Sequence, residues 1–405
     1  MKKTIIIGGG VSGLAAKELV EQKGGSAEII CDDTHSVLPD ADLIIASPGV
    51  PPLKSGLYQQ AMASGIEFIG ELEFGFRHWQ RPILAITGTN GKTTTTALLT
   101  HLLQSCGIAA ESAGNIGRPL SDLAVNSTAE VAVVEVSNFQ LELAPTFAPL
   151  AAALLNLQSD HIDRYVDGFD GYCRVKKQIF RHVAPENRIL GLSFKEYSPR
   201  RVTVDNGILK VDDRTLLRLD ETDLPGEPNA ENLAAATELM LRYDEKLILD
   251  DIEKFASAVK SFKRAPHRIE KVGSARGITF VNDSKGTNPA AVIAALEAMD
   301  TPVILMLGGL AKGMDFSVLR DKCQKVHHAV LFGQDRQEIA GALSGIFPMK
   351  DTGMDFEAAF DCAIELAEPG DTILLSPGCA SMDMFKNYKV RGEKFRELAE
   401  KFINS

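Results

Sequence analysis

The sequence predicts an α/β protein in which parallel β-sheets are covered by helices. Short runs of β-branched and aliphatic residues alternate with longer segments of helical periodicity, which is the pattern of repeated strand–helix units. A chain of 405 residues is long enough for two or three domains of ordinary size. Hydrophobic residues make up 45% and charged residues 24% of it, so a disordered, collagen-like or disulfide-scaffold protein is excluded.

Each predicted strand is a short apolar run flanked by turn residues or by a polar segment. In chain order, strands are expected at residues 4–7, 28–31, 43–46, 83–87, 131–136, 151–155, 279–281, 303–307, 329–332 and 372–375. Apolar residues at helical spacing lie between many of these runs. They predict helices over residues 93–106, 230–242, 289–298 and 356–366.

Two changes of pattern predict three domains. A helical segment begins near residue 70, and the stretch 263–267 separates a helix from a new series of strands. We therefore expect three α/β domains, at residues 1–69, 70–265 and 266–405. Residues 201–219 contain turn pairs between brief strands, which predicts a small hairpin inserted in the middle domain.

Net charge, apolar runs and cysteine usage indicate which binding partners and which cellular compartment to expect. Lys and Arg total 43 against 54 Asp and Glu, and the formal charge of −11 argues against nonspecific binding of nucleic acid or anionic membranes. The apolar run after Lys3 is interrupted by glycines, so it fits a buried strand better than a secretory signal, and no apolar stretch is long enough to span a bilayer. Six scattered cysteines without a CxxC pair indicate reduced thiols. We expect a cytoplasmic protein without membrane insertion.

The strongest local signal is a glycine-bearing loop between a strand and a helix. Residues 83–87 (ILAIT) are followed by residues 88–94 (GTNGKTT) and then by helical periodicity. Such a loop directs backbone N–H groups to one point, where they and Lys92 can neutralise phosphate oxygens, while Thr93 can reach a magnesium ion. Ile86 stands where the strict Walker pattern has glycine, so we interpret the loop as a variant. An incidental Gly/Thr turn is the alternative, and the flanking strand and helix argue against it.

A second glycine loop, residues 8–13 (GGGVSG), follows the first predicted strand. Alone it is compatible with a dinucleotide site, with another phosphate ligand, or with a tight strand–helix turn. Asp32 and Asp33 end the next strand, about where a ribose-binding carboxylate would lie. A dehydrogenase with one cofactor would explain one of the two glycine loops and leave the other without a role.

Two further strands lead into polar residues at the sheet edge where open α/β sheets bind ligands. Residues 131–136 (VAVVEV) place Glu135 near a strand end, and residues 154–163 (LLNLQSDHID) place His161 after another strand. Both are candidate partners of one magnesium–triphosphate site. The alternatives are a solvated strand terminus for Glu135 and an ordinary surface or core histidine for His161.

Four polar loops adjoin predicted strands in the last third of the chain. They are residues 266–270 (PHRIE), 281–289 (VNDSKGTNP), 308–312 (GGLAK) and 376–383 (SPGCASMD). Any one of them could be a turn with helix-capping residues, but four in one domain favour a composite polar site.

Together these loops resemble those of the Mur ligases, and the resemblance covers all three predicted domains. The GTNGKTT loop is common to that family, and folylpolyglutamate synthases share the core plan. The segments IIIGGGVSGLAA, VNDSKGTNPAA and LLSPGCASMDMFKNYKVRG resemble the members that add D-glutamate. The resemblance implies an ADP-forming amide-bond ligase that adds D-glutamate to UDP-N-acetylmuramoyl-L-alanine through an acyl phosphate, in peptidoglycan precursor synthesis. It also implies that the first and third domains are Rossmann-like and that the middle domain is a P-loop-type ATPase sheet. ATP and two Mg²⁺ ions are the expected cofactors, and we expect a monomer.

The resemblance further implies roles for residues that match family motifs in the central domain. The ATP phosphate loop would be Gly88, Thr89, Asn90, Gly91, Lys92, Thr93 and Thr94. The catalytic and metal-binding set would be Lys92, Thr93, Glu135, His161 and, if carbamylated, Lys176. Lys177 is the alternative equivalent of Lys176. Asn229 and Asn232 match an adenine-side motif, in which Pro228 replaces a usual histidine.

The remaining matches concern ATP closure and substrate binding. Arg268, Asp283 and Lys285 match residues that close over ATP. Ser12, Asp33 and Thr34 match uridine-diphosphate contacts, with His35 at a place where arginine is frequent, and Asn115 and Ser137 match substrate contacts. Thr287, Lys312, Ser381, Phe385 and Tyr388 match the pocket for the carboxylates of D-glutamate.

Two other classes of protein compete with this interpretation. A nicotinamide-dependent oxidoreductase would use the first glycine loop and would leave Lys92, Glu135 and Lys285 without roles. A regulatory or motor P-loop ATPase would hydrolyse ATP without an amino acid and would not need the polar loops near the carboxyl end.

Overall fold

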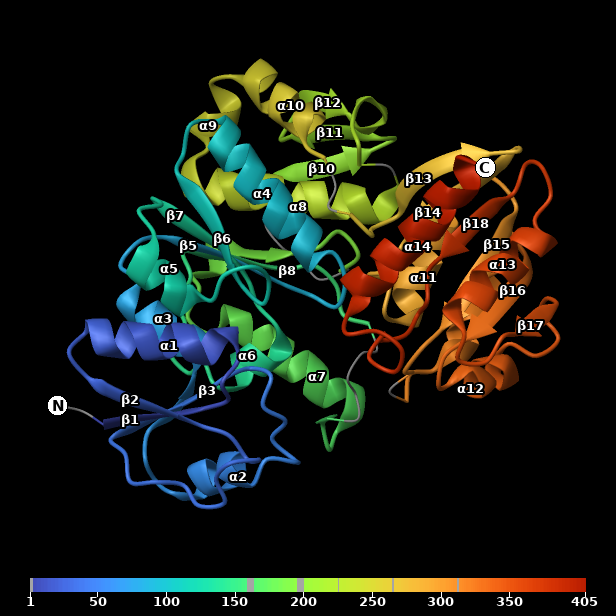
Figure 1. The fold of residues 1–405 in the computed structure, drawn as a ribbon. Coiled ribbons are helices and arrows are strands. Elements are labelled where there is room, and N and C mark those ends of the chain that lie inside the picture. Colours follow the sequence, from blue (N-terminus) through green and yellow to red (C-terminus); the bar gives the residue numbers. More distant parts are fainter. Residues whose placement is uncertain (1–2, 159–163, 195–199, 225, 264–265, 312) are drawn as a thin grey trace. The chain divides into compact units, whose positions relative to one another are not determined.

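The computed structural model describes the chain except for residues 1–2, 159–163, 195–199, 225, 264–265 and 312 (Figure 1). Its internal contacts divide it into two compact units. The first comprises Met1–Leu157, Asp170–Asp223 and Asn229–Phe262, and the second comprises Gln158–Phe169, Leu224–Pro228 and Lys263–Ser405. The first unit holds three sheets and the second one. The predicted α/β class is confirmed, whereas the domain boundaries near residues 70 and 266 remain predictions.

The amino-terminal sheet is parallel, with strand order β2-β1-β3-β4. Its strands are β1 (Lys3–Ile7), β2 (Ser26–Ile30), β3 (Leu43–Ala46) and β4 (Phe68–Gly70), and its helices are α1 (Val11–Gln22), α2 (Gly56–Ala63) and α3 (Glu71–His78). Successive side chains of a strand point to opposite faces. Ile6 therefore packs with residues of α1 and α3, while Ile5 and Ile7 pack with residues of α2. Alternating burial of this kind gives the sheet a helical layer on each face.

The central sheet is also parallel, with strand order β6-β7-β5-β8-β9. Its strands are β5 (Ile83–Thr87), β6 (Ala110–Gly114), β7 (Val131–Glu135), β8 (Ala151–Leu154) and β9 (Arg188–Leu190). The α-helices of this part of the chain are α4 (Lys92–Ser105), α5 (Leu120–Asn126), α6 (Asn138–Glu142), α7 (Gly168–Lys177), α8 (Glu227–Asp244), α9 (Lys246–Leu249) and α10 (Ile252–Ser261). Short 3₁₀-helices are Gln178–Phe180, Pro185–Asn187 and Leu219–Glu221. β5 lies between β7 and β8, so the carboxyl ends of three neighbouring strands meet at the loop after Thr87.

The predicted hairpin insertion is confirmed as a three-stranded antiparallel sheet. β10 (Val202–Asp205), β11 (Ile208–Val211) and β12 (Arg214–Arg218) follow one another in space as in sequence. Asn206 and Asp212 turn the chain with φ of +49° and +51°, which is a conformation that Asn and Asp tolerate better than most residues.

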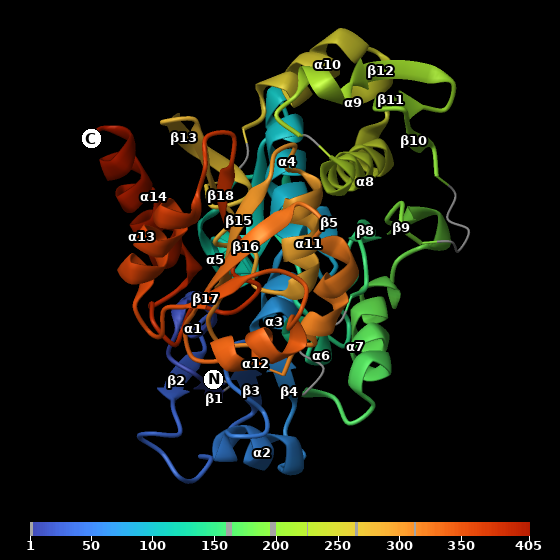
Figure 2. The ribbon, with the colours of Figure 1, turned by 90° about the vertical axis from the view of Figure 1, so that its right-hand side faces the viewer.

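The second unit contains a mixed sheet with strand order β13-β14-β18-β15-β16-β17. Its strands are β13 (Glu270–Ala275), β14 (Ile278–Asn282), β15 (Val303–Gly308), β16 (Val326–Phe332), β17 (Met349–Asp351) and β18 (Thr372–Leu375). β13 is antiparallel to β14, and the remaining pairs are parallel. One face packs against α11 (Pro289–Glu297), α12 (Arg336–Ala342) and the 3₁₀-helix Phe316–Lys322, and the other against α13 (Phe356–Leu366) and α14 (Tyr388–Ile403) (Figure 2).

In the described part of the chain, none of the helices is both long and apolar enough to cross a membrane. All six cysteines are free, as the absence of CxxC pairs predicts, and Cys323 and Cys379 are buried.

Candidate active site

The loop after β5 has the geometry of a phosphate-binding loop. Gly91 is the N-cap of α4 with φ of +83°, and a β-carbon there would lie 2.2 Å from Asn232 Oδ1 on α8. Thr95 donates a hydrogen bond to the same oxygen over 3.1 Å. Asn232 therefore fixes the first turn of α4, whose N–H groups and dipole favour an anion at the loop.

Two lysines converge on one carbonyl of this loop. Lys92 Nζ donates to Gly88 O at 2.8 Å and to Thr89 O at 2.7 Å, and Lys176 Nζ donates to Gly88 O at 2.9 Å. Lys176 also bonds Thr87 Oγ1 over 3.3 Å and is only 1% exposed, whereas Lys177 is exposed. Burial separates these two candidates, and Lys176 is the one placed at the loop. Two ammonium groups at one turn of backbone make a strongly electropositive site.

Neighbouring side chains hold the loop in shape. Asn156, after β8, accepts from Asn90 N at 2.9 Å through Oδ1 and from Thr89 N at 3.1 Å through its backbone carbonyl. The hydroxyl groups of Thr89 and Tyr172 lie 2.9 Å apart, and Tyr172 is 1% exposed. The sequence motifs do not predict a role for Asn156 or Tyr172. The loop is thus braced from two elements that are distant in sequence.

Glu135 ends β7 beside the loop and is 1% exposed, so it is not a solvated strand terminus. Ile86 and Glu135 are paired between β5 and β7, and Asn115 Nδ2 donates to Glu135 Oε1 over 2.8 Å. Glu135 Oε2 is buried without a hydrogen-bond partner. A buried carboxylate oxygen left unsatisfied is costly, and hard cations such as Mg²⁺ prefer oxygen ligands. The residues therefore fit a cation at this position.

Of the other predicted metal ligands, the structure describes Thr93 but not His161. Thr93 lies in the first turn of α4, next to the lysine of the loop, and Thr94 behind it is buried. His161 lies outside the described residues. Among the residues that the structure does describe, no three or more His, Cys, Asp or Glu side chains gather as a preformed metal site. A cation here would be held by few protein carboxylates together with ligand oxygens, which is the usual manner of Mg²⁺.

Ser137 has a structural partner, and the two asparagines predicted for the adenine side are buried. Ser137 is the N-cap of α6 in a capping box, accepting from Gln140 N while Gln140 Oε1 accepts from Ser137 N. Asn229 and Asn232 lie on the first turns of α8 with 8% and 4% exposure.

The first glycine loop joins β1 to α1. Gly8 has φ of +100°, and a β-carbon on Gly13 would lie 2.0 Å from Gly8 O, so both glycines are needed for this close strand–helix turn. Ser12 is half-buried on the first turn of α1, and Asp33 and Thr34 are exposed. Thr34 Oγ1 lies 2.8 Å from His35 Nδ1.

Asp32 has a structural task at the start of α2. Its Oδ1 accepts from Leu57 N at 3.0 Å, and hydrogen bonds led by that from Ser55 lower the pKa of its carboxyl. This carboxylate is therefore engaged in the fold, which weakens the dinucleotide interpretation of the first loop. Asp33 is left as the acid available at that strand end.

In the second unit, Asp283 follows β14 and joins two of the predicted polar loops. Its Oδ2 accepts from Ser376 Oγ at 2.8 Å and its Oδ1 from Ile269 N at 3.3 Å. Burial raises the pKa of Asp283 to about 7, although the Ser376 hydrogen bond and the charge of Arg268 act in the opposite direction. Arg268 lies on one of the tethered loops, so two residues predicted to close over ATP are structurally linked.

The residues predicted for the D-glutamate pocket lie on the same unit. Lys285 Nζ lies 5.0 Å from the centre of the Tyr388 ring. Ser381 is buried and Thr287 half-buried, whereas Phe385 packs edge-on against Phe356 with ring centres 5.1 Å apart. Lys312 lies outside the described residues. Phe385 therefore contributes to the hydrophobic core as well as standing in the predicted pocket.

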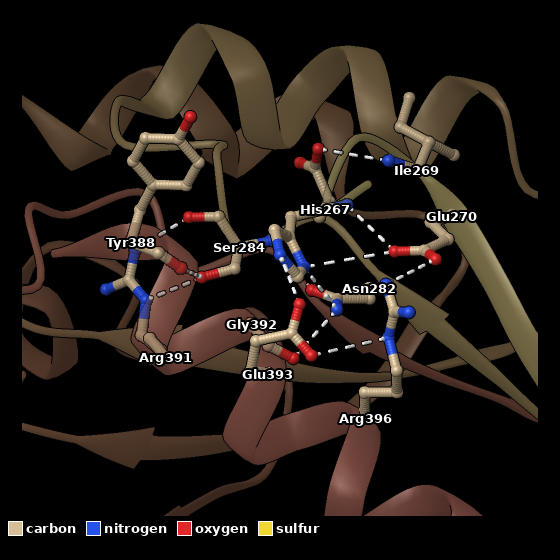
Figure 3. A network of polar contacts seen from close by, with 11 residues as sticks. His267, Ile269, Glu270, Asn282, Ser284, Tyr388, Arg391, Gly392, Glu393 and Arg396 are labelled. Atoms are coloured by element: carbon tan, nitrogen blue, oxygen red, sulfur yellow. Dashed lines mark hydrogen bonds and ion pairs between the residues drawn. The ribbon is translucent and has the colours of Figure 1, made fainter. Parts of the chain in front are cut away.

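Arg391 connects two of these loops and was not predicted. It is fully buried on α14, where Nε donates to Ser284 Oγ at 3.0 Å and Nη2 donates to Ser284 O at 2.8 Å (Figure 3). Nη2 also donates to Cys379 O at 3.1 Å. Burial lowers the pKa of Arg391 to about 10. The arginine ties the loop after β14 to the loop after β18.

Comparison with known proteins agrees with this arrangement. The Mur ligase middle domain matches residues 86–201, and the domain described as Mur ligase, glutamate ligase domain matches residues 267–379. The chain belongs to the Mur ligase family.

Within that family, the chain is similar to proteins named UDP-N-acetylmuramoylalanine--D-glutamate ligase. The one from Caldanaerobacter subterraneus subsp. tengcongensis is 36% identical, covering 95% of this chain and 90% of the relative, and the one from Cytophaga hutchinsonii is 35% identical, covering 98% of each. Among solved structures, the MurF ligase from Thermotoga maritima in complex with ADP has a TM-score of 0.61 at 18% identity, covering 99% of this chain and 95% of that one. The structural match supports the fold.

Proposed function

We propose that the protein is an ATP-dependent ligase that joins D-glutamate to UDP-N-acetylmuramoyl-L-alanine, releasing ADP and phosphate, in peptidoglycan precursor synthesis. The observation that carries the proposal is the loop at residues 88–94. There the ammonium groups of Lys92 and Lys176 meet at Gly88 O, beside a buried carboxylate oxygen of Glu135 that has no hydrogen-bond partner. The near full-length similarity to D-glutamate ligases supports the choice of substrates.

In the first step, a carboxylate oxygen of the L-alanyl group attacks the γ-phosphorus of ATP, the bond from that phosphorus to the β–γ bridging oxygen breaks, and ADP leaves. Both reactants are anions, so their approach has to be stabilised by positive charge and fixed by position. Lys92 and the N–H groups at the start of α4 supply that charge. Lys176 adds to it only as an unmodified ammonium group, because a carbamylated Lys176 is an anion and a metal ligand instead. Glu135, Thr93, His161 and a carbamylated Lys176 would hold two magnesium ions, which supply charge neutralisation on the triphosphate when bound.

In the second step, the D-glutamate amine attacks the carbonyl carbon of the acyl phosphate. The tetrahedral intermediate loses a proton from nitrogen and expels phosphate, which leaves the amide. Arg268, Asp283 and Lys285 are the residues assigned to ATP on the second unit. The assigned pocket for the glutamate carboxylates is Thr287, Lys312, Ser381, Phe385 and Tyr388.

The remaining assignments concern contacts with the nucleotide and the muramoyl substrate, the cellular compartment and the oligomeric state. Asn229 and Asn232 are assigned to the adenine side, and Asn115 and Ser137 to the muramoyl substrate. Ser12, Asp33 and Thr34 are assigned to the uridine diphosphate. The enzyme is inferred to act in the cytoplasm as a monomer.

The test is phosphate release by the purified chain with ATP, Mg²⁺, nucleotide sugar and D-glutamate, together with the omission of each. We expect release only with the complete mixture, and none when L-glutamate replaces D-glutamate. Lys176→Ala is expected to abolish release, while the exposed neighbour Lys177→Ala serves as the matched control and keeps it. ATP hydrolysis without the amino acid, or turnover with L-glutamate alone, would contradict the proposal.

A further inference from the structure

The turn that carries Arg268 has an unusual backbone. His267 and Ile269, on either side of Arg268, have φ of +66° and +46°. Left-handed conformations are uncommon for residues other than glycine and are true outliers for a β-branched residue. Such a turn persists only where its surroundings hold it, so the contacts of its two strained residues identify what holds it.

The imidazole of His267 is enclosed by a hydrogen-bond network. It is 4% exposed, with Nδ1 3.0 Å from Asn282 Nδ2 and Nε2 3.2 Å from Glu393 Oε1 (Figure 3). Asn282 Nδ2 also donates to Gly392 O at 3.0 Å, and Asn282 Oδ1 accepts from Ser284 N at 3.2 Å. These two bonds fix the orientation of the amide, so its second hydrogen points to His267 Nδ1. Nδ1 is therefore the acceptor, and the neutral ring carries its proton on Nε2, towards Glu393.

Close packing against Gly392 also fixes the position of the His267 imidazole. Gly392 lies on α14 directly against the ring, and a β-carbon at that position would lie 2.4 Å from His267 Nδ1 and 2.7 Å from its Cγ. Any side chain at residue 392 would displace the imidazole. A glycine inside a helix otherwise weakens the helix, so its presence in α14 is explained by the room that the ring needs.

The backbone of the same turn is tied to the residues assigned to ATP. His267 O accepts from Lys285 N at 3.1 Å, and Ile269 N donates to Asp283 Oδ1 at 3.3 Å. His267 N in turn donates to Glu270 Oε2 at 2.8 Å. The residue before Arg268 and the residue after it are thus both anchored, and one of these anchors also fixes the backbone of Lys285.

We propose that His267 is a positioning residue for ATP: its imidazole, seated between Asn282 and Gly392, holds the strained turn that presents the guanidinium of Arg268 and the ammonium of Lys285 to the nucleotide triphosphate. This inference rests on the proposed function, because the assignment of Arg268 and Lys285 to ATP does. His267 acts through these two cations and does not itself touch the nucleotide.

The test is a steady-state comparison of His267→Ala, Gly392→Ala and the double variant, with KM determined for each of the three substrates. Loss of the anchor misplaces two cations, so kcat/KM for ATP is expected to fall roughly 10- to 100-fold in each single variant. KM for the nucleotide sugar is expected to stay unchanged. Because Gly392 serves only to admit the ring, adding Gly392→Ala to His267→Ala should cost nothing further. His267→Gln can accept from Asn282 and donate to Glu393, and it should restore most of the loss.

Three results would overturn the inference. The first is wild-type kcat/KM for ATP in His267→Ala, and the second is an equal loss of kcat/KM for all three substrates. The third is a double variant in which the losses of kcat/KM from the two single changes add in full. Thermal unfolding shows whether each variant is folded. If His267→Ala does not fold, His267→Gln and Gly392→Ala still test the inference. A wild-type enzyme that forms no product would refute the proposed function instead. An inactive Arg268→Ala beside a fully active His267→Ala would refute the positioning role alone.

Discussion

Glu71 offers a stability prediction whose size follows from the structure. It is buried in the first turn of α3, where Oε1 accepts from Ser121 N at 2.8 Å and Oε2 has no hydrogen-bond partner. Burial raises the pKa of this carboxyl from an ordinary 4.5 to about 7. The ionised form therefore destabilises the folded protein by roughly 3 kcal/mol at pH 8.

The pH dependence has a definite sign. Between pH 4.5 and about 7 the folded state binds more protons at Glu71 than the unfolded state does, so this residue makes stability fall as pH rises. Glu71→Gln keeps an acceptor for Ser121 and removes the charge. We expect the variant to be more stable than the parent protein by up to about 3 kcal/mol at pH 8, with the gain shrinking below about 1 kcal/mol near pH 5.

Glu73, two residues along the same helix, is a matched control with the opposite expectation. It is also buried, but it accepts from Arg77 Nε at 2.9 Å and from Thr146 N at 3.1 Å. Glu73→Gln should destabilise by at least about 1 kcal/mol, because it breaks a charge-assisted pair. Thermal and urea unfolding at pH 5 and pH 8 measure both variants. A gain for Glu71→Gln that does not depend on pH, or a loss at pH 8, would refute the reasoning.

Three further predictions concern the phosphate loop. Lys92→Ala should reduce kcat/KM for ATP by at least roughly 100-fold while the thermal unfolding of the protein stays unchanged. Turnover close to wild type would contradict a phosphate-binding role for this lysine. Gly91→Ala places a β-carbon 2.2 Å from Asn232 Oδ1 at a φ of +83°, so it should destabilise by about 1–3 kcal/mol in thermal unfolding and raise KM for ATP. Glu135→Gln should raise the Mg²⁺ concentration for half-maximal activity by roughly 10-fold or more, and an unchanged magnesium titration would contradict a ligand role.

Much of the fold was predictable because interior strands of parallel sheets are buried on both faces and read as apolar runs. β5, β7, β8, β15 and β18 lie where the sequence places them. The strands that were missed, β4, β6, β9, β13 and β17, all lie at sheet edges. β4, β9 and β17 have only three residues each, and β6 (AESAG) and β13 (EKVGSA) contain few large apolar residues, so their pattern is weak.

The candidate site was predictable to the extent that it lies in loops directly after strands. The phosphate loop starts at the predicted residue, Gly88, whereas β14 extends to Asn282 and so includes the first two residues of the predicted loop 281–289. The side chains that brace these loops were not found, because they come from distant segments: Asn156 lies 66 residues from Asn90, and Arg391 lies 107 residues from Ser284. Gly392 carried a usable signal, since a glycine within a strong helical pattern points to close packing.

The central claim is that ATP activates the substrate by direct phosphoryl transfer to its carboxylate, and an isotope experiment tests it most directly. The nucleotide sugar is prepared with oxygen-18 in the L-alanyl carboxylate and is converted with ATP and D-glutamate. The proposed chemistry requires one labelled oxygen in the released phosphate. A labelled carboxylate oxygen links carbon to phosphorus in the acyl phosphate, and it leaves with the phosphate when the amine attacks and the acyl C–O bond breaks. Phosphate free of the label, with amide product formed, would contradict it.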